Sequence, residues 1–172
     1  MTVCASAAAL RRTFLGIALA SLAAAAACAE VVADNSACRN LEYKDGSVER
    51  AKYLPCAAEM IATLEDLDRQ SKAALDGDAQ ARAQGQAALR RLRGLVSAAG
   101  GRQLLERWPD RPLTDLNLDI SNALTKYEAF YMLGPVDASS RFARESRAAA
   151  TAEYEGGNRR YEEAKRLFRR LN

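Results

Sequence analysis

Acidic side chains are the residues of this chain best placed to do chemistry, because the sequence contains no histidine. Asp115 and Asp119 are four residues apart, and Asn122 and Lys126 continue the same face of a predicted helix. Two close carboxylates can bind a hard cation or split their pKa values for acid–base catalysis. This face lies opposite the apolar side of the helix, so solvated, structural carboxylates are the favoured interpretation. The same interpretation applies to three acidic residues further upstream: Glu65, Asp66 and Asp68.

Most other kinds of catalytic site are absent from the sequence. Without histidine there is no common general base, no usual zinc or copper ligand and no Ser-His or Cys-His nucleophile. Neither the P-loop pattern nor G-x-G-x-x-G occurs. The sequence favours a non-enzymatic role, and we predict no catalytic residue, metal site or cofactor.

Two cysteines, Cys38 and Cys56, remain once Cys4 and Cys28 are assigned to the N-terminal segment described below. An even pair in an exported chain favours a disulfide. Redox-active pairs are usually spaced as C-x-x-C, which this pair is not. We therefore predict a structural disulfide that ties the N-terminal part of the domain to the first long helix.

An aromatic group offers the best candidate for a ligand pocket. It comprises Trp108, Tyr127, Phe130 and Tyr131. Aromatic-lined sites between the helices of a bundle are common, but packing in the core explains the same pattern and is favoured.

A basic group near the C-terminus could contact an anion or an acidic partner. It comprises Arg159, Arg160, Arg166, Arg169 and Arg170. Glu155–Arg159 and Glu162–Arg166 are i, i+4 pairs in the favourable order, so a self-compensated, solvated helix is the favoured interpretation.

The elements that position these residues are predicted to be helices. Ser47 can cap a short turn over 48–54, and Pro55 suits the first turn of a helix that ends at Asp76-Gly77. Asp78 can cap a second helix over 79–99, which Gly100-Gly101 ends. Residues 102–108 favour a short helix.

The C-terminal half is predicted to contain a third long helix and a divided last segment. Thr114 can cap the third helix, which ends at Gly134-Pro135. Asp137 can cap a segment that ends near Tyr154, and Gly156-Gly157 then precedes a terminal helix. Because no period-two pattern is sustained and the connections are short, we predict an all-α antiparallel bundle of about four main helices with short extra helices.

The first 29 residues are predicted to be a cleaved export signal. Arg11 and Arg12 precede an uncharged run from Thr13 to Ala29, and small residues, Ala27 among them, stand before the first acid. These are the three parts of a bacterial secretory signal. The mature chain is then one domain over 30–172, with a disulfide-tied segment over 30–54 and the bundle over 55–172.

Two resemblances bear on the export route and on attachment to the membrane. Arg11-Arg12-Thr13-Phe14-Leu15 resembles the twin-arginine motif, which implies export of a folded domain; an ordinary Sec signal is the alternative. "AAAC", ending at Cys28, resembles a lipobox, in which the cysteine is lipidated. Cleavage after Ala29 is the preferred alternative.

Charge limits the partners. The first 29 residues hold two of the 25 basic residues and none of the 22 acidic ones, so the remainder is nearly neutral. Near neutrality argues against a nucleic-acid binder. We expect a periplasmic protein, or one lipid-anchored to the envelope, without a transmembrane helix after processing. Another envelope protein or a cell-wall polymer is the expected partner.

Two further resemblances are limited. Tyr161, Ala164, Phe168 and Leu171 resemble the second helix of a tetratricopeptide repeat, but no second copy occurs upstream. Cys38, Cys56 and "LEDLDRQ" are similar to exported lysozyme-inhibitor-like proteins, whose further cysteines are missing here.

The favoured role is thus a non-enzymatic binding or structural module. The alternatives are a small-ligand or cofactor-binding bundle, a carboxylate-dependent cell-wall hydrolase and a lysozyme-inhibitor-like protein.

Overall fold

The computed structural model describes residues 36–42, 48–100, 110–135 and 141–172. These residues form four α-helices and one short 3₁₀ helix: η1 (Ala37–Asn40), α1 (Arg50–Leu75), α2 (Ala79–Ala98), α3 (Arg111–Met132) and α4 (Ala143–Leu171). No strand occurs in these ranges. The predicted all-α class, with about four main helices, is confirmed.

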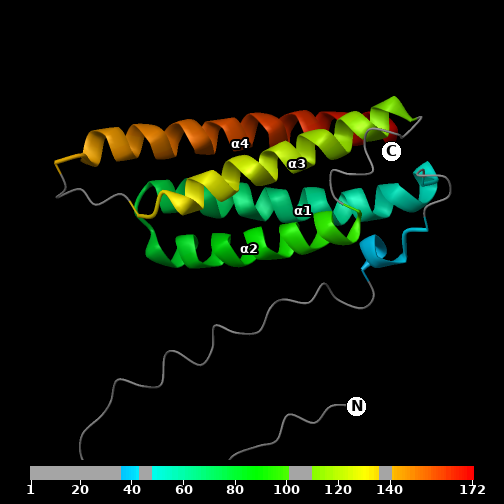
Figure 1. The fold of residues 1–172 in the computed structure, drawn as a ribbon, viewed down its shortest axis with the longest axis horizontal. Coiled ribbons are helices and arrows are strands. Elements are labelled where there is room, and N and C mark those ends of the chain that lie inside the picture. The colour runs from blue at the N-terminus through cyan, green and yellow to red at the C-terminus, as the bar shows by residue number, and fades with distance from the viewer. Residues whose placement is uncertain (1–35, 43–47, 101–109, 136–140) are drawn as a thin grey trace, which may run out of the picture.

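The four helices alternate in direction. α1 and α3 run one way and α2 and α4 the other, so helices that follow one another in the chain are antiparallel (Figure 1). α1 packs most closely with α2, and α3 with α4, while α1 also contacts both α3 and α4. Among the described helices α2 and α4 make no contact, so they occupy opposite corners of the bundle.

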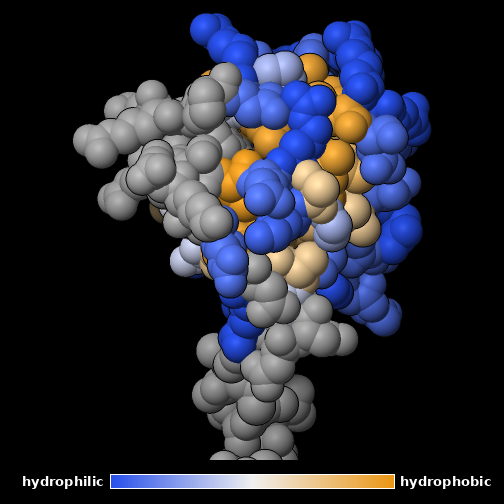
Figure 2. Space-filling view, turned by 90° about the vertical axis from the view of Figure 1, so that its right-hand side faces the viewer, coloured by the Kyte–Doolittle hydropathy of each residue, from blue (hydrophilic) through white to orange (hydrophobic). Residues whose placement is uncertain are grey.

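The predicted apolar faces form the core. Met60, Leu92, Leu116 and Ala164, one from each helix, are fully buried. At the end of the bundle that carries the C-terminus, hydrophobic atoms gather in the middle of the face and hydrophilic side chains border them (Figure 2). Phe168 and Leu171, in the last turns of α4, pack against the core and stay partly exposed.

Three predicted helix ends are confirmed. Gly77, Gly100 and Gly134 have φ angles of 102°, 83° and 74°, and each follows the last residues of a helix. A left-handed residue ends a helix at little cost only when it lacks a Cβ. The predicted cap of α2 is also confirmed, because the Asp78 carboxylate accepts hydrogen bonds from the backbone of Gln80 and Ala81.

Pro55 was predicted to open a new helix, and this prediction is wrong. α1 begins at Arg50 and continues through Pro55, so the predicted separate turn over 48–54 is part of α1 and the bundle begins before residue 55. Tyr53 and Cys56 flank the proline and are both fully buried. Their packing outweighs the proline's lost hydrogen bond, which falls in the second turn. Ser47, the expected cap, lies outside the described residues.

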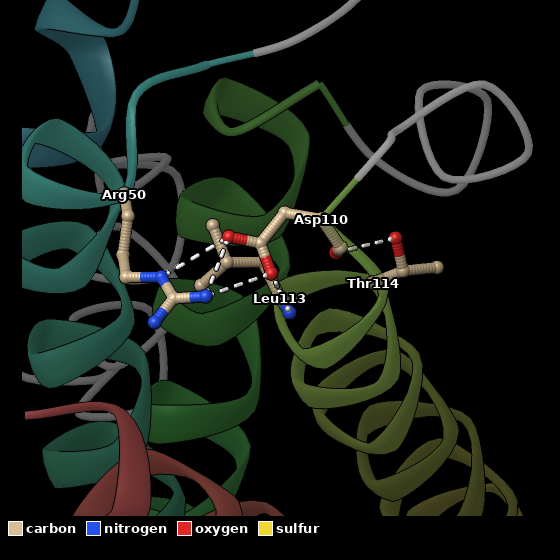
Figure 3. Close-up of polar contacts among 4 residues, drawn as sticks. All are labelled: Arg50, Asp110, Leu113 and Thr114. Carbon is tan, nitrogen blue, oxygen red and sulfur yellow. Dashed lines mark hydrogen bonds and ion pairs between the residues drawn. The ribbon is translucent and has the colours of Figure 1, made fainter.

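The predicted start of α3 at Thr114 is also wrong. The helix begins at Arg111, and its N-cap is Asp110, whose carboxylate accepts a hydrogen bond from the backbone N–H of Leu113. Pro112 fits the first turn because the N–H it lacks would have no partner there. Thr114 instead donates its hydroxyl to the Asp110 carbonyl at 3.2 Å (Figure 3).

Asp110 also joins α3 to α1. The Arg50 guanidinium, in the first turn of α1, donates from Nε and Nη2 to the Asp110 carboxylate at 2.8 to 3.1 Å (Figure 3). One carboxylate thus caps one helix and holds the start of another.

Asp110→Ala should lower the free energy of unfolding by about 1–2 kcal/mol, because it removes the cap and a partly exposed ion pair. Asp110→Asn keeps a good capping side chain and should cost less than half as much. Urea denaturation of both variants measures the difference. Equal losses would show that the ion pair, and not the cap, provides the stabilisation.

The predicted break at Gly156-Gly157 is wrong as well, since α4 runs without interruption from Ala143 to Leu171. Both glycines are buried. A Cβ on Gly157 would lie 2.9 Å from Cζ of Tyr127, so the missing side chain lets α3 and α4 approach closely. The glycines are therefore packing positions. Asp137 and residues 102–108 lie outside the described residues.

The predicted disulfide is confirmed between Cys38, in η1, and Cys56, in α1. Both cysteines are fully buried. The Glu59 carboxylate makes a second connection, because it accepts hydrogen bonds from Ser36 Oγ and the Ala37 backbone, both at 2.8 Å. η1 is thereby fixed to the N-terminal half of α1.

Candidate functional site

A surface groove lies between α3 and α4. Its volume is about 490 Å³. The α3–α4 groove is lined by Asn122, Thr125, Lys126, Gly156, Arg159, Arg160 and Glu163. It brings together two sets of residues that the sequence separates, the polar face that begins at Asp115 and part of the C-terminal basic group.

Two of the groove's cations are held by carboxylates of the opposite helix. Arg160 donates to Asp119 at 3.0 Å, and Lys126 donates to Glu153 at the same distance. Each pair joins α3 to α4. The acidic partners, Asp119 and Glu153, do not line the groove. Three cations and one carboxylate, that of Glu163, therefore face it.

Asp119 is less exposed than expected from sequence. Its side chain is 13% exposed, whereas that of Asp115 is 46% exposed and pairs with Arg111 on its own helix. α4 covers the Asp119 side of α3. Burial raises the pKa of the Asp119 carboxyl above its ordinary value, and the Arg160 guanidinium offsets only part of this rise. The two aspartates therefore face different ion-pair partners and do not form a carboxylate pair.

Arg159 differs from its neighbour. It is exposed and has no ion pair or hydrogen bond within the described residues, so the predicted Glu155–Arg159 pair is not formed there. Arg166 pairs with Glu163 at 3.0 Å, and its Nε contacts the Glu162 carbonyl but not the predicted Glu162 carboxylate. Arg159 is thus the cation of the groove that is open to a ligand.

The remaining basic residues do not join the groove. Arg169 and Arg170 are exposed in the last turn of α4, where cations suit the helix C-terminus. The five arginines of the predicted basic group thus divide, and only Arg159 and Arg160 line the groove.

Three members of the aromatic group lie in the core. Tyr127, Phe130 and Tyr131 are 0%, 1% and 7% exposed, and Trp108 lies outside the described residues. The Phe130 and Tyr131 rings contact edge to face with centroids 4.9 Å apart. The buried positions of Tyr127 and Phe130 fit the packing interpretation of this group.

Both tyrosines bond to α1 through their hydroxyl groups. Tyr127 donates to the Asp68 carboxylate at 2.7 Å, and the Tyr131 hydroxyl lies 3.1 Å from Ser71 Oγ. Asn158, on α4, donates to the same Asp68 oxygen at 2.9 Å. Asp68 therefore connects three helices.

This role of Asp68 could not be read from the sequence, where it stands beside Glu65 and Asp66 without distinction. Asp66 pairs with Arg69 on its own helix, and Glu65 lies 3.9 Å from Lys165 on α4. Position does not separate them either, because Glu65 directly follows the buried Leu64 as Asp68 follows the buried Leu67.

Alkaline pH should destabilise the fold through the tyrosines. Burial and the adjacent Asp68 carboxylate raise the pKa of Tyr127 far above 10, and the same causes raise that of Tyr154 to about 12. Unfolded tyrosines ionise near pH 10, so the stabilisation is complete below that pH and is lost as pH rises above it.

Urea denaturation from pH 8 to 11, followed by circular dichroism, measures this loss. Tyr127→Phe should be less stable at pH 8, because Asp68 loses a donor, and it should lose less stability per pH unit above 10. If the natural protein and the variant lost the same free energy of unfolding per pH unit above pH 10, the loss could not be assigned to Tyr127.

Two properties of the described part of the chain complete this description. No three side chains of His, Cys, Asp or Glu lie close enough there to hold a metal ion. None of the described helices is long and apolar enough to cross a membrane.

Comparison with protein-family models, with curated proteins and with solved structures finds no match to this chain.

Proposed function

We propose that this chain is an exported protein of the bacterial cell envelope and that its helical domain is a non-enzymatic binding module. We place it in the periplasm, with attachment through a lipid on Cys28 as the alternative. Its partner is another envelope protein. The observation that carries the binding role is the α3–α4 groove, in which positioned cations face outward.

The division of polar groups between core and surface supports this role. The hydroxyls of Tyr127 and Tyr131 and the carboxylate of Asp68 are engaged in bonds between helices. Side chains so engaged are not available as acids, bases or nucleophiles without breaking those bonds. Arg159 is exposed and has no such role in the fold.

Two observations support export. Residues 1–29 contain the charged start, the apolar run and the small residues of a secretory signal. The Cys38–Cys56 disulfide is of the kind that forms and persists in oxidising compartments.

Intact-mass measurement on the protein from its native envelope fraction tests export. We expect a mature chain that begins at Glu30, or at a lipidated Cys28, and that lacks two hydrogens because of the disulfide. Full-length protein found only in the cytoplasm would contradict the location.

Site-specific photo-crosslinking in intact cells tests the binding role. A photoreactive residue is placed at three exposed positions: Arg159 in the α3–α4 groove, and Arg90 and Met132, which line a second hollow between α2 and α3. At least one position should give a discrete covalent adduct with another envelope protein. If none of them does, the binding role fails.

A further inference from the structure

The three cations of the α3–α4 groove point to a class of ligand. We infer that this groove binds the side-chain carboxylates of an acidic peptide segment in a partner protein. The inference rests on the proposed binding role and names the surface and the partner chemistry, which that proposal leaves open.

The geometry suits carboxylates. Lys126 and Arg160 are each held by a 3.0 Å ion pair across the two helices, so part of the cost of ordering these long side chains is met before a ligand arrives. Arg159 keeps its guanidinium unpaired within the described residues. A guanidinium can bind a carboxylate through two parallel hydrogen bonds.

The groove also offers contacts for a peptide backbone. Thr125 is exposed, and its hydroxyl proton goes to the Ser121 carbonyl at 3.0 Å, which leaves the oxygen able to accept from a peptide N–H. Gly156 is a buried lining residue without a side chain, and the aliphatic part of the Lys126 side chain lies beside it. The Glu163 carboxylate adds a second acceptor for N–H groups.

The same observations disfavour an anionic membrane. Binding to a membrane surface usually inserts apolar side chains beside the cations. The large exposed hydrophobic residues of the described chain are Leu118, Met132, Leu133 and Phe142, and none of them lines the groove.

The direct test is binding of a fluorescein-labelled octapeptide of alternating Glu and Asp to the mature protein at low salt. Arg159→Glu should weaken binding about tenfold, because it removes an attraction and adds a repulsion. Arg159→Lys keeps the positive charge but lacks the planar guanidinium with its two parallel N–H donors, and it should weaken binding less. Binding should also fall as salt rises, because exposed charges are screened.

Arg90→Glu is the matched control. Arg90 is exposed on α2, has no ion pair in the described part of the chain and does not line the groove. The control changes net charge by the same amount and should leave binding nearly unchanged. Circular dichroism checks that all variants are folded.

Three outcomes would overturn the inference. If Arg159→Glu and Arg90→Glu weakened octapeptide binding equally, the peptide would be attracted only by the overall charge of the protein. No octapeptide binding at low salt would exclude the site. The third outcome is that Arg159 is needed to bind inorganic phosphate, or vesicles of phosphatidylglycerol and phosphatidylethanolamine, while the octapeptide does not bind. That result would assign the groove to another ligand.

The crosslinking experiment separates failure of this inference from failure of the proposed function. An adduct from position 90 or 132, without one from position 159, would keep the binding role and exclude the groove. An adduct from position 159 that the octapeptide suppresses in cell extract supports both.

Discussion

Gly157→Ala is expected to lower the free energy of unfolding by about 2 kcal/mol, although alanine is the better helix former. A Cβ at this position would lie 2.9 Å from Cζ of Tyr127 and 3.0 Å from Cε1 and Cε2. The ring cannot move aside easily, because it is fully buried and its hydroxyl is bonded to Asp68. The gain of about 1 kcal/mol in helix propensity offsets only part of this overpacking.

The neighbouring glycine provides a matched control. A Cβ on Gly156 would meet only the side chain of Lys126, at 3.2 Å from Cδ, and that flexible chain can shift. Gly156→Ala should therefore be neutral or more stable than the natural protein by up to about 1 kcal/mol. Both substitutions are in the same helix, so helix propensity cancels in the comparison.

Urea denaturation with unchanged m-values measures both effects. A double-mutant cycle sharpens the test, because in a Tyr127→Leu background Gly157→Ala should lose most of its cost. If Gly157→Ala stayed destabilising in that background, its effect would not come from the tyrosine ring. Gly85 on α2 is a second such position, since a Cβ there would overlap the Tyr131 hydroxyl.

Removing the disulfide is the other change with a large expected effect. Cys38 and Cys56 are separated by 18 positions, and closing a loop of this size in the unfolded chain corresponds to about 3 kcal/mol of stabilisation. Cys38→Ala with Cys56→Ala should lower the free energy of unfolding by about that amount. The loss arises because the unfolded chain regains the conformational entropy that the cross-link removes.

Glu59→Ala separates this effect from the docking of η1. It removes the bonds to Ser36 and Ala37 but keeps the disulfide. We expect a loss of about 1–2 kcal/mol, smaller than that of the double cysteine variant. A double cysteine variant as stable as the natural protein would show that the cross-link contributes nothing and that Glu59 suffices.

Sequence patterns predicted most of the fold because helix formation depends on neighbours in the chain. The apolar stripe that runs from Ala81 through Gly85 and Leu92 is buried, as its spacing indicated. Asp78 and the glycines that end three helices act through backbone conformation and local hydrogen bonds, which the sequence alone specifies.

The same local signals were wrong where packing opposes them. Pro55 and Gly156-Gly157 are helix breakers by propensity, yet each lies within a continuous helix. The preferences involved amount to about 1–3 kcal/mol per residue, and burial of the flanking side chains exceeds them. Propensity therefore misplaced a helix start and divided α4 in two.

The candidate site was predicted only in part. Asn122, Lys126, Arg159 and Arg160 were all singled out, but as members of two separate surfaces. Which carboxylate pairs with which cation depends on how helices distant in sequence pack together. The Arg160–Asp119 pair spans 41 positions and the Tyr127–Asp68 bond spans 59.

The sequence by itself determined the helical class, the apolar faces and the cysteine pair, because each follows from residue types at local spacings. Only the tertiary structure decided that Asp68 is an internal acceptor, that Asp119 is covered and that Arg159 is open to solvent. Asp68 and Asp119 each follow a leucine, so their neighbours in the sequence do not distinguish them. Their different environments arise because the side on which α4 packs against α1 and α3 determines which charges lose contact with water.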